Sequence, residues 1–161
     1  MNKCSEKDIR VLLHNIRSAH NVGAIFRTCD AIGVSHVYLS GYSPLPIDKF
    51  GRPVKEIAKT ALGAEKSIPW EYVKNFAKLI EKLKEEGFEM VAIEQDARAV
   101  DYKTFCAKNK TLILVGNEVR GLSPSIRKHA DHIVEIPMRG KKESLNVSIA
   151  FGVAMFRVFD V

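Results

Sequence analysis

Short apolar runs alternate with helical patterns along the chain, and this alternation most constrains what it can fold into. The runs at 9–16, 34–40, 88–94, 111–117 and 132–138 are rich in Val, Ile and Leu, as buried strands are. Helical spacing marks 21–32, 54–62, 73–83 and 145–159, and Pro124 favours a short helix nearby. Strands that alternate with helices form a parallel sheet covered on both faces. We therefore expect an α/β fold with a Rossmann-like parallel sheet, in one domain spanning 1–161.

Two further segments refine this expectation. "SIPWEYV" at 67–73 predicts a short edge strand, since its proline lies near the start. "GYSPLPIDKFGRP" at 41–53 is the longest loop, and structureless loops of this length are usually functional. Ligands of parallel sheets bind beyond the carboxyl ends of the strands. That rule directs attention to the loops 94–99, 116–122 and 137–146.

The charge balance gives a weak indication of the partner. There are 25 Lys and Arg against 19 Asp and Glu, a net charge of +6. Such an excess favours polyanions such as RNA or DNA. No apolar run approaches the roughly 20 residues of a membrane span, the start "MNKCSEKDIR" lacks a signal-peptide pattern, and the three cysteines lie far apart. We expect a cytoplasmic protein with no membrane contact.

The stretch "NVGAIFRTCDAIG" predicts a helix with one apolar stripe and Arg27 on the opposite side. Gly23 lies one turn before Arg27, and a missing side chain there would open space for a ligand. An exposed arginine near a helix-start glycine is the commoner explanation for such a pattern.

The stretch "LVGNEVRGLS" has the glycine spacing of a phosphate-binding P-loop after a strand. Leu122 and Ser123 stand where that motif requires Lys and then Ser or Thr, so a nucleoside triphosphate site is disfavoured. No G-x-G-x-x-G follows any strand either. What remains is a strand end where a ligand can approach bare backbone beside Glu118.

The stretch "IPMRGKKESLNVSIAFG" joins a strand end, a basic loop and the last helix. We expect Ser144 to cap that helix. The basic tip of Arg139, Lys141 and Lys142 would suit phosphate contacts, although a solvated loop with an ordinary cap would have the same composition.

The last helix is apolar nearly all round. Leu145, Ile149, Val153 and Phe156 share one face, and further apolar residues cover the others. Such a helix is buried on more than one side. One side can pack on the sheet and another on a second subunit, so we expect a homodimer through this helix. The H-x-x-H of His129 and His132 lacks a third ligand, and we expect no metal.

Taken together and in order, "HNIRSAHNVGAIFRTCDAIG", "LILVGNEVRGLS" and "IPMRGKKESLNVSIAFG" resemble the three motifs of the SpoU branch of the SPOUT RNA methyltransferases. The resemblance extends over essentially the whole chain. It implies a C-terminal deep trefoil knot, a dimer formed through the knot, and methylation of a ribose 2′-hydroxyl in tRNA or rRNA by S-adenosylmethionine. The implied cofactor residues are Ile93, Glu94, Gln95, Gly116, Asn117, Glu118, Ile136, Met138, Ser144, Leu145 and Val147.

The resemblance also implies catalytic roles. The motif arginine corresponds to Arg27, which would activate the ribose hydroxyl; Asn21, Glu118, Ser144 and Asn146 would frame the site. Free arginine is always protonated near neutral pH. It acts as a base only if its surroundings disfavour the cation; otherwise a substrate phosphate accepts the proton while Arg27 orients the group.

If the chain resembles a minimal member of this family, RNA would be bound by the catalytic core, a partner subunit or another protein. Many relatives carry an extra N-terminal RNA-binding domain, and here the first strand begins within about ten residues of Met1, as in a minimal core. The candidate phosphate contacts are Arg27, Arg52, Lys55, Lys59, Arg139, Lys141 and Lys142. We expect tRNA ahead of rRNA as substrate, and the alternative is a catalytically inactive RNA- or S-adenosylmethionine-binding module of the same fold.

Overall fold

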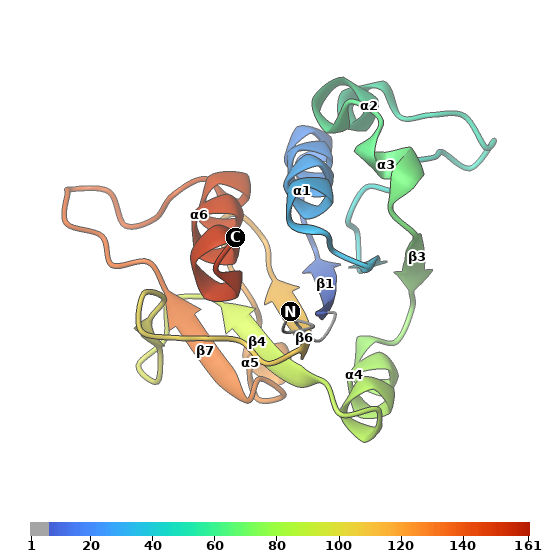
Figure 1. Cartoon of the computed structure of the whole chain (residues 1–161). Coiled ribbons are helices and arrows are strands. Elements are labelled where there is room, and N and C mark those ends of the chain that lie inside the picture. The colour runs from blue at the N-terminus through green and yellow to red at the C-terminus, as the bar shows by residue number, and fades with distance from the viewer. Residues whose placement is uncertain (1–6) are drawn as a thin grey trace, which may run out of the picture.

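The computed structural model describes residues 7–161, in which seven parallel strands form one sheet (Figure 1). The strands are β1 (Asp8–His14), β2 (His36–Ser40), β3 (Trp70–Val73), β4 (Glu89–Ile93), β5 (Val100–Asp101), β6 (Lys110–Val115) and β7 (His132–Glu135). The helices are α1 (Ala19–Ile32), α2 (Lys55–Ala61), α3 (Ala64–Ser67), α4 (Phe76–Glu85), α5 (Pro124–Arg127) and α6 (Val147–Phe159). The strand order β3-β2-β1-β6-β4-β7-β5 places β6 between β1 and β4.

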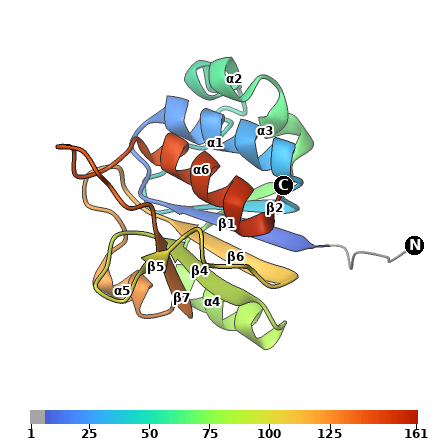
Figure 2. The same ribbon diagram turned by 60° about the vertical axis from the view of Figure 1, so that its left-hand side comes forward.

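Helices cover both faces of the sheet, as the alternation predicts (Figure 2). Successive residues of β1 show why: Val11 and Leu13 pack into the core shared with α1 and α6, whereas Leu12 packs into the core shared with α4 and α5. All three are fully buried. The part of a strand that is buried on both faces must be apolar at successive positions, which explains the apolar runs in the sequence. The trefoil knot remains a prediction.

Helix α1 is bounded by two capping residues. The Ser18 hydroxyl accepts from the Asn21 N–H at the start, and Gly33 ends the helix in the left-handed conformation. Val22, Ile25, Phe26 and Cys29 form the buried stripe, as predicted.

The prediction that Gly23 opens space for a ligand is wrong. A Cβ on Gly23 would overlap the Ile57 carbonyl oxygen and Thr60 Oγ1 of α2. The glycine instead allows the two helices to approach closely, and Thr60 Oγ1 donates to the His20 carbonyl of α1 across this contact at 2.9 Å.

Helix α6 begins two residues later than expected, and its capping residue is Asn146 rather than Ser144. Asn146 Oδ1 accepts from the Ser148 N–H at 2.9 Å and from the Ile149 N–H at 3.4 Å. On its inner side the helix buries Phe151, Ala154, Met155, Val158 and Phe159. On its outer side Ile149, Val153 and Phe156 are 40–55% exposed, and Leu145, which precedes the helix and was expected on the same face, is 37% exposed.

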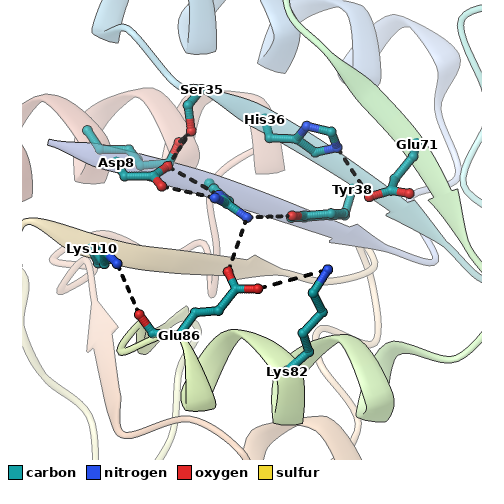
Figure 3. Close-up of polar contacts among 10 residues, drawn as sticks. Asp8, Ser35, His36, Tyr38, Glu71, Lys82, Glu86 and Lys110 are labelled. Carbon is teal, nitrogen blue, oxygen red and sulfur yellow. Dashed lines mark hydrogen bonds and ion pairs between the residues drawn. The ribbon is translucent and has the colours of Figure 1, made fainter.

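A polar cluster lies toward the amino ends of β1 and β2, where Figure 3 shows Asp8, Tyr38 and Glu86 converging. The Arg10 guanidinium lies at its centre: it donates to both oxygens of Asp8 at 3.0 and 3.2 Å and to Tyr38 Oη at 3.1 Å, and it stacks on the Phe88 ring. Burial opposes ionisation of Asp8, but hydrogen bonds from Arg10 and Ser35 outweigh it and lower the Asp8 pKa. These charges are paired with one another, so we interpret the cluster as structural.

Candidate functional site

A cavity of about 250 Å³ opens at the carboxyl edge of the sheet. Its walls come from the ends of β4, β6 and β7 and from the start of α6, the loops that the sheet rule selected. It is lined by every residue expected to contact the cofactor, namely Ile93, Glu94, Gln95, Gly116, Asn117, Glu118, Ile136, Met138, Ser144, Leu145 and Val147. Three segments far apart in sequence therefore form one cavity.

Other lining residues were not named individually from the sequence, although four of them lie in the loops 116–122 and 137–146 that the sheet rule selected: Val115, Val119, Arg120, Gly121, Glu135, Glu143, Ala150 and Phe151. Most lie beside an anticipated residue in the same loop, so proximity alone could have suggested them. Phe151 had a clearer signal, since it lies one helical turn after Val147 and shares its face.

Glu118 connects the loop after β6 to the start of α1. Its Oε2 accepts from the Arg17 N–H at 2.8 Å, and its Oε1 accepts from the Ser18 N–H and from Asn21 Nδ2, both at 3.0 Å. Burial alone would raise the Glu118 pKa, but these hydrogen bonds, led by that from Arg17, lower it below its ordinary value. The carboxylate is therefore an anchor that is ionised in the folded protein.

Asn21 extends this connection to α6. Its side-chain oxygen accepts from Asn146 Nδ2 at 3.2 Å while its side-chain nitrogen donates to Glu118. Asn146 also caps α6, so the chain Glu118–Asn21–Asn146 links the loop after β6, the first helix and the last helix. Three of the five predicted catalytic residues are thus hydrogen-bonded together. Ser144 lines the adjoining cavity.

The Glu94 carboxylate packs against the loop 116–122. It accepts from the Leu122 N–H at 2.7 Å and from the Gln95 N–H at 2.9 Å. Gly121 has a φ of +64°, and a Cβ there would overlap the Glu94 carboxylate. A Cβ on Gly116 would overlap the Gly121 backbone. Both glycines are therefore required for the packing of the loop itself, in addition to their place in the cavity wall.

Arg27 lies on the exposed side of α1, as its pattern predicts. Among the described residues it is not part of the cavity lining, and no hydrogen bond joins it to Asn21, Glu118 or Asn146. The other candidate RNA contacts, Arg52, Lys55, Lys59, Arg139, Lys141 and Lys142, are also exposed. They come from two separate segments: one around α2, and the loop that precedes α6.

Several other features bear on the class of site. Within residues 7–161, no three His, Cys, Asp or Glu side chains form a group that could bind a metal ion. No helix in this part of the chain is long and apolar enough to cross a bilayer. Cys29 is buried and Cys106 exposed, both as free thiols, and Cys4 lies outside the described residues.

Comparison with known proteins gives one consistent family. Residues 8–156 match the sequence model described as the SpoU rRNA Methylase family. A tRNA (guanosine(18)-2′-O)-methyltransferase of Aquifex aeolicus is 34% identical over 151 residues, which cover 94% of this chain and 68% of that protein. The next four curated relatives are matched over 56–59% of their length, so this chain spans little more than half of them.

Solved structures agree with the sequence comparison. The A. aeolicus TrmH/SpoU tRNA modifying enzyme superposes with a TM-score of 0.82 at 33% identity, over 95% of this chain and 74% of that one. An AdoMet-bound rRNA methyltransferase from Sinorhizobium meliloti superposes with a TM-score of 0.83 at 31% identity, over 96% of this chain and 56% of that one. From its sequence, its parallel sheet and these likenesses, the chain belongs to the SpoU rRNA Methylase family.

Proposed function

We propose that this protein is an S-adenosylmethionine-dependent RNA methyltransferase that modifies a ribose 2′-hydroxyl. The observation that carries the proposal is the hydrogen-bonded chain Glu118–Asn21–Asn146 beside the cavity. It supports a site assembled from three motifs, because each motif contributes one member. The 2′-O-methyltransferase named among the relatives and the AdoMet-bound structure of another support the same chemistry.

The cavity suits S-adenosylmethionine in its charge and its lining. Ile93, Ile136 and Leu145 would give the cofactor apolar surface, and four carboxylates (Glu94, Glu118, Glu135 and Glu143) line the cavity in a chain whose net charge is +6. Carboxylates favour a ligand that carries sulfonium and ammonium charges. When bound, this cofactor supplies an electrophilic methyl group.

The residues of the chain would act by alignment. Glu118 and Glu94 keep the loop 116–122 in position through backbone hydrogen bonds, and Asn146 positions the start of α6. We assign Arg27 the role of orienting the ribose or its phosphate, because a planar guanidinium can donate two parallel hydrogen bonds to a phosphate; in this scheme the phosphate takes the proton. These residues would hold the ribose hydroxyl in line with the methyl group that the bound cofactor supplies, and such alignment can accelerate a transfer strongly.

Arg27→Ala tests this assignment, with Arg27→Lys as the matched variant that keeps the charge but not the planar fork. We expect Arg27→Ala to retain S-adenosylmethionine binding by calorimetry and to lose at least about 100-fold in methyl transfer, as expected when a positioning contact is removed. An unchanged transfer rate would remove Arg27 from the mechanism. Binding of cofactor and RNA by the wild type without any transfer would instead favour the inactive binding module.

We further propose a tRNA substrate ahead of rRNA, a cytoplasmic location, and a homodimer through the knot and α6. The relatives include enzymes named for either RNA, so ribose-methylation mapping by mass spectrometry in cells with and without the gene is the deciding experiment. The exposed apolar face formed by Ile149, Val153 and Phe156 of α6 supports the dimer. Size-exclusion chromatography with light scattering that gives a stable monomer at micromolar concentration would contradict it.

A further inference from the structure

The loop 41–53, here called the arm, carries features that the proposed function has not used. It leaves the carboxyl end of β2 and extends from the body of the protein before entering α2 (Figure 1). Its outer half is a small hairpin closed by a bridge between Ile47 and Pro53. Asp48 holds the tip, since its Oδ1 accepts from the Phe50 and Arg52 N–H groups at 2.8 and 3.0 Å. The outer half of the arm is therefore a hairpin fixed by hydrogen bonds rather than an irregular loop.

The tip of this hairpin presents an aromatic ring to solvent with two cations close to it. Phe50 is 68% exposed, more than any other described phenylalanine. Lys49 Nζ lies 5.0 Å from the centroid of its ring and the Arg52 guanidinium lies 4.9 Å from it. Arg52 is held in this position by Asp48 Oδ2, to which its Nε donates at 2.9 Å.

The root of the arm is attached to the wall of the cofactor cavity. Asn117, which lines the cavity, donates from Nδ2 to Tyr42 Oη at 3.0 Å. The Tyr42 N–H donates to Asn15 Oδ1 at 3.1 Å, and the carbonyl of Asn15 accepts from the same Asn117 side chain. The arm consequently starts beside the candidate site, on the same edge of the sheet.

An exposed aromatic ring with cations close to it is suited to nucleic acid more than to a protein surface. Bases stack on aromatic side chains irrespective of sequence, and adjacent Lys and Arg neutralise the backbone phosphates. Arg52 is already ion-paired with Asp48, but Lys49 and the remaining N–H groups of Arg52 are available to phosphates. A protein partner would gain from the apolar ring alone, whereas RNA can use the ring and these donors together.

We propose that Phe50 stacks on an unpaired base of the RNA substrate, with Lys49 and Arg52 contacting the neighbouring phosphates. This inference rests on the proposed function for the identity of the ligand, and it adds an element that selects RNA with unpaired nucleotides near the modified ribose. Because Phe50 lies on the arm, it contacts a flanking nucleotide whatever its base, and it takes no part in the transfer step.

The test compares Phe50→Ala, Phe50→Leu and Phe50→Trp in the full chain. The probes are a fluorescently labelled 12-nucleotide single-stranded RNA and the same strand annealed to its complement. Val100→Ala is the matched control, because Val100 is an exposed apolar residue, 44% accessible, on the far edge strand β5. Fluorescence anisotropy gives the affinities, and denaturant unfolding confirms that each variant is folded.

We expect Phe50→Ala and Phe50→Leu to weaken binding of the single strand by about 5- to 100-fold, the effect of losing one stacked base. Phe50→Trp should bind at least as tightly as the wild type, and the control should be unaffected. The duplex should show little dependence on residue 50. Wild-type affinity in Phe50→Ala, or full affinity in Phe50→Leu, would overturn the inference and point to a protein partner for the ring.

The binding assay does not depend on methyl transfer, so the two proposals fail separately. If the wild type binds the single strand through Phe50 but transfers no methyl group to bulk tRNA or rRNA, the proposed activity is contradicted and the stacking inference is still supported. If the wild type methylates RNA but Phe50→Ala binds the single strand with wild-type affinity, the proposed activity is supported and the stacking inference is contradicted. Absence of any RNA binding by the wild type would overturn the inference itself.

Discussion

Replacement of Glu118 by Gln tests whether the candidate site depends on a single carboxylate. The two side chains have the same shape, but the amide presents an N–H₂ group where one carboxylate oxygen was. Glu118 accepts three hydrogen bonds, from the Arg17 and Ser18 backbone and from Asn21. One amide oxygen can replace only one carboxylate oxygen, so at least one of these donors meets another donor.

The expected loss can be estimated from these contacts. A donor left without an acceptor costs about 1–3 kcal/mol when buried. Arg17 is exposed, so water can reach its N–H, whereas Ser18 and Asn21 are partly buried. The lower half of that range applies, and we expect Glu118→Gln to lower the free energy of unfolding by about 1–2 kcal/mol.

Urea denaturation at several pH values provides the assay. The pKa of Glu118 is lowered in the folded state, so its contribution is present above its ordinary value of 4.5 and is lost as the pH falls through the lower folded value. The difference in the free energy of unfolding between wild type and Glu118→Gln should therefore have its full value at neutral pH and decrease below about pH 4.5. Glu81→Gln, at an exposed position of α4, is the control. A difference below about 0.5 kcal/mol at pH 7, or one that is constant with pH, would refute this account of the anchor.

Two other variants follow from the corrections made by the structure. Gly23→Ala should destabilise the protein by about 1–3 kcal/mol in thermal or urea unfolding, because its Cβ meets the Ile57 carbonyl; a neutral effect would show that α1 and α2 can separate at little cost. Asn146→Ala should lower stability by about 1 kcal/mol through loss of the α6 cap, whereas Ser144→Ala should change it by less than about 0.5 kcal/mol; equal losses from both would contradict the assignment of the cap to Asn146.

Much of the fold could be predicted because buried parallel strands leave a direct trace in the sequence. The runs around Val11, Val91 and Ile113 are apolar since both of their faces are covered. Helix α3 and strand β5 were not anticipated, because elements of four and two residues are too short to show a period. The insertion of β6 between β1 and β4 left no local signal, since strand order is decided by packing over the whole sheet.

The errors at the candidate site have a common origin. Ser144 and Asn146 are both good capping residues two positions apart, and only the backbone geometry decides which of them accepts the first N–H groups. Gly23 could leave room for either a ligand or a neighbouring helix, and its sequence neighbours are the same in both cases. In both cases the residue type allows two arrangements, and the packing of the rest of the chain determines which one forms.

The chain Glu118–Asn21–Asn146 also has a consequence for how the protein is made. Its two hydrogen bonds join residues that are 97 and 125 positions apart. Contacts of such long range form late, because the intervening chain must first be ordered. During synthesis the first helix leaves the ribosome long before its two partners, so the nascent protein should remain unable to bind its cofactor until residue 146 has emerged. The order of translation thus delays the assembly of the site until all the described strands of the sheet have been made.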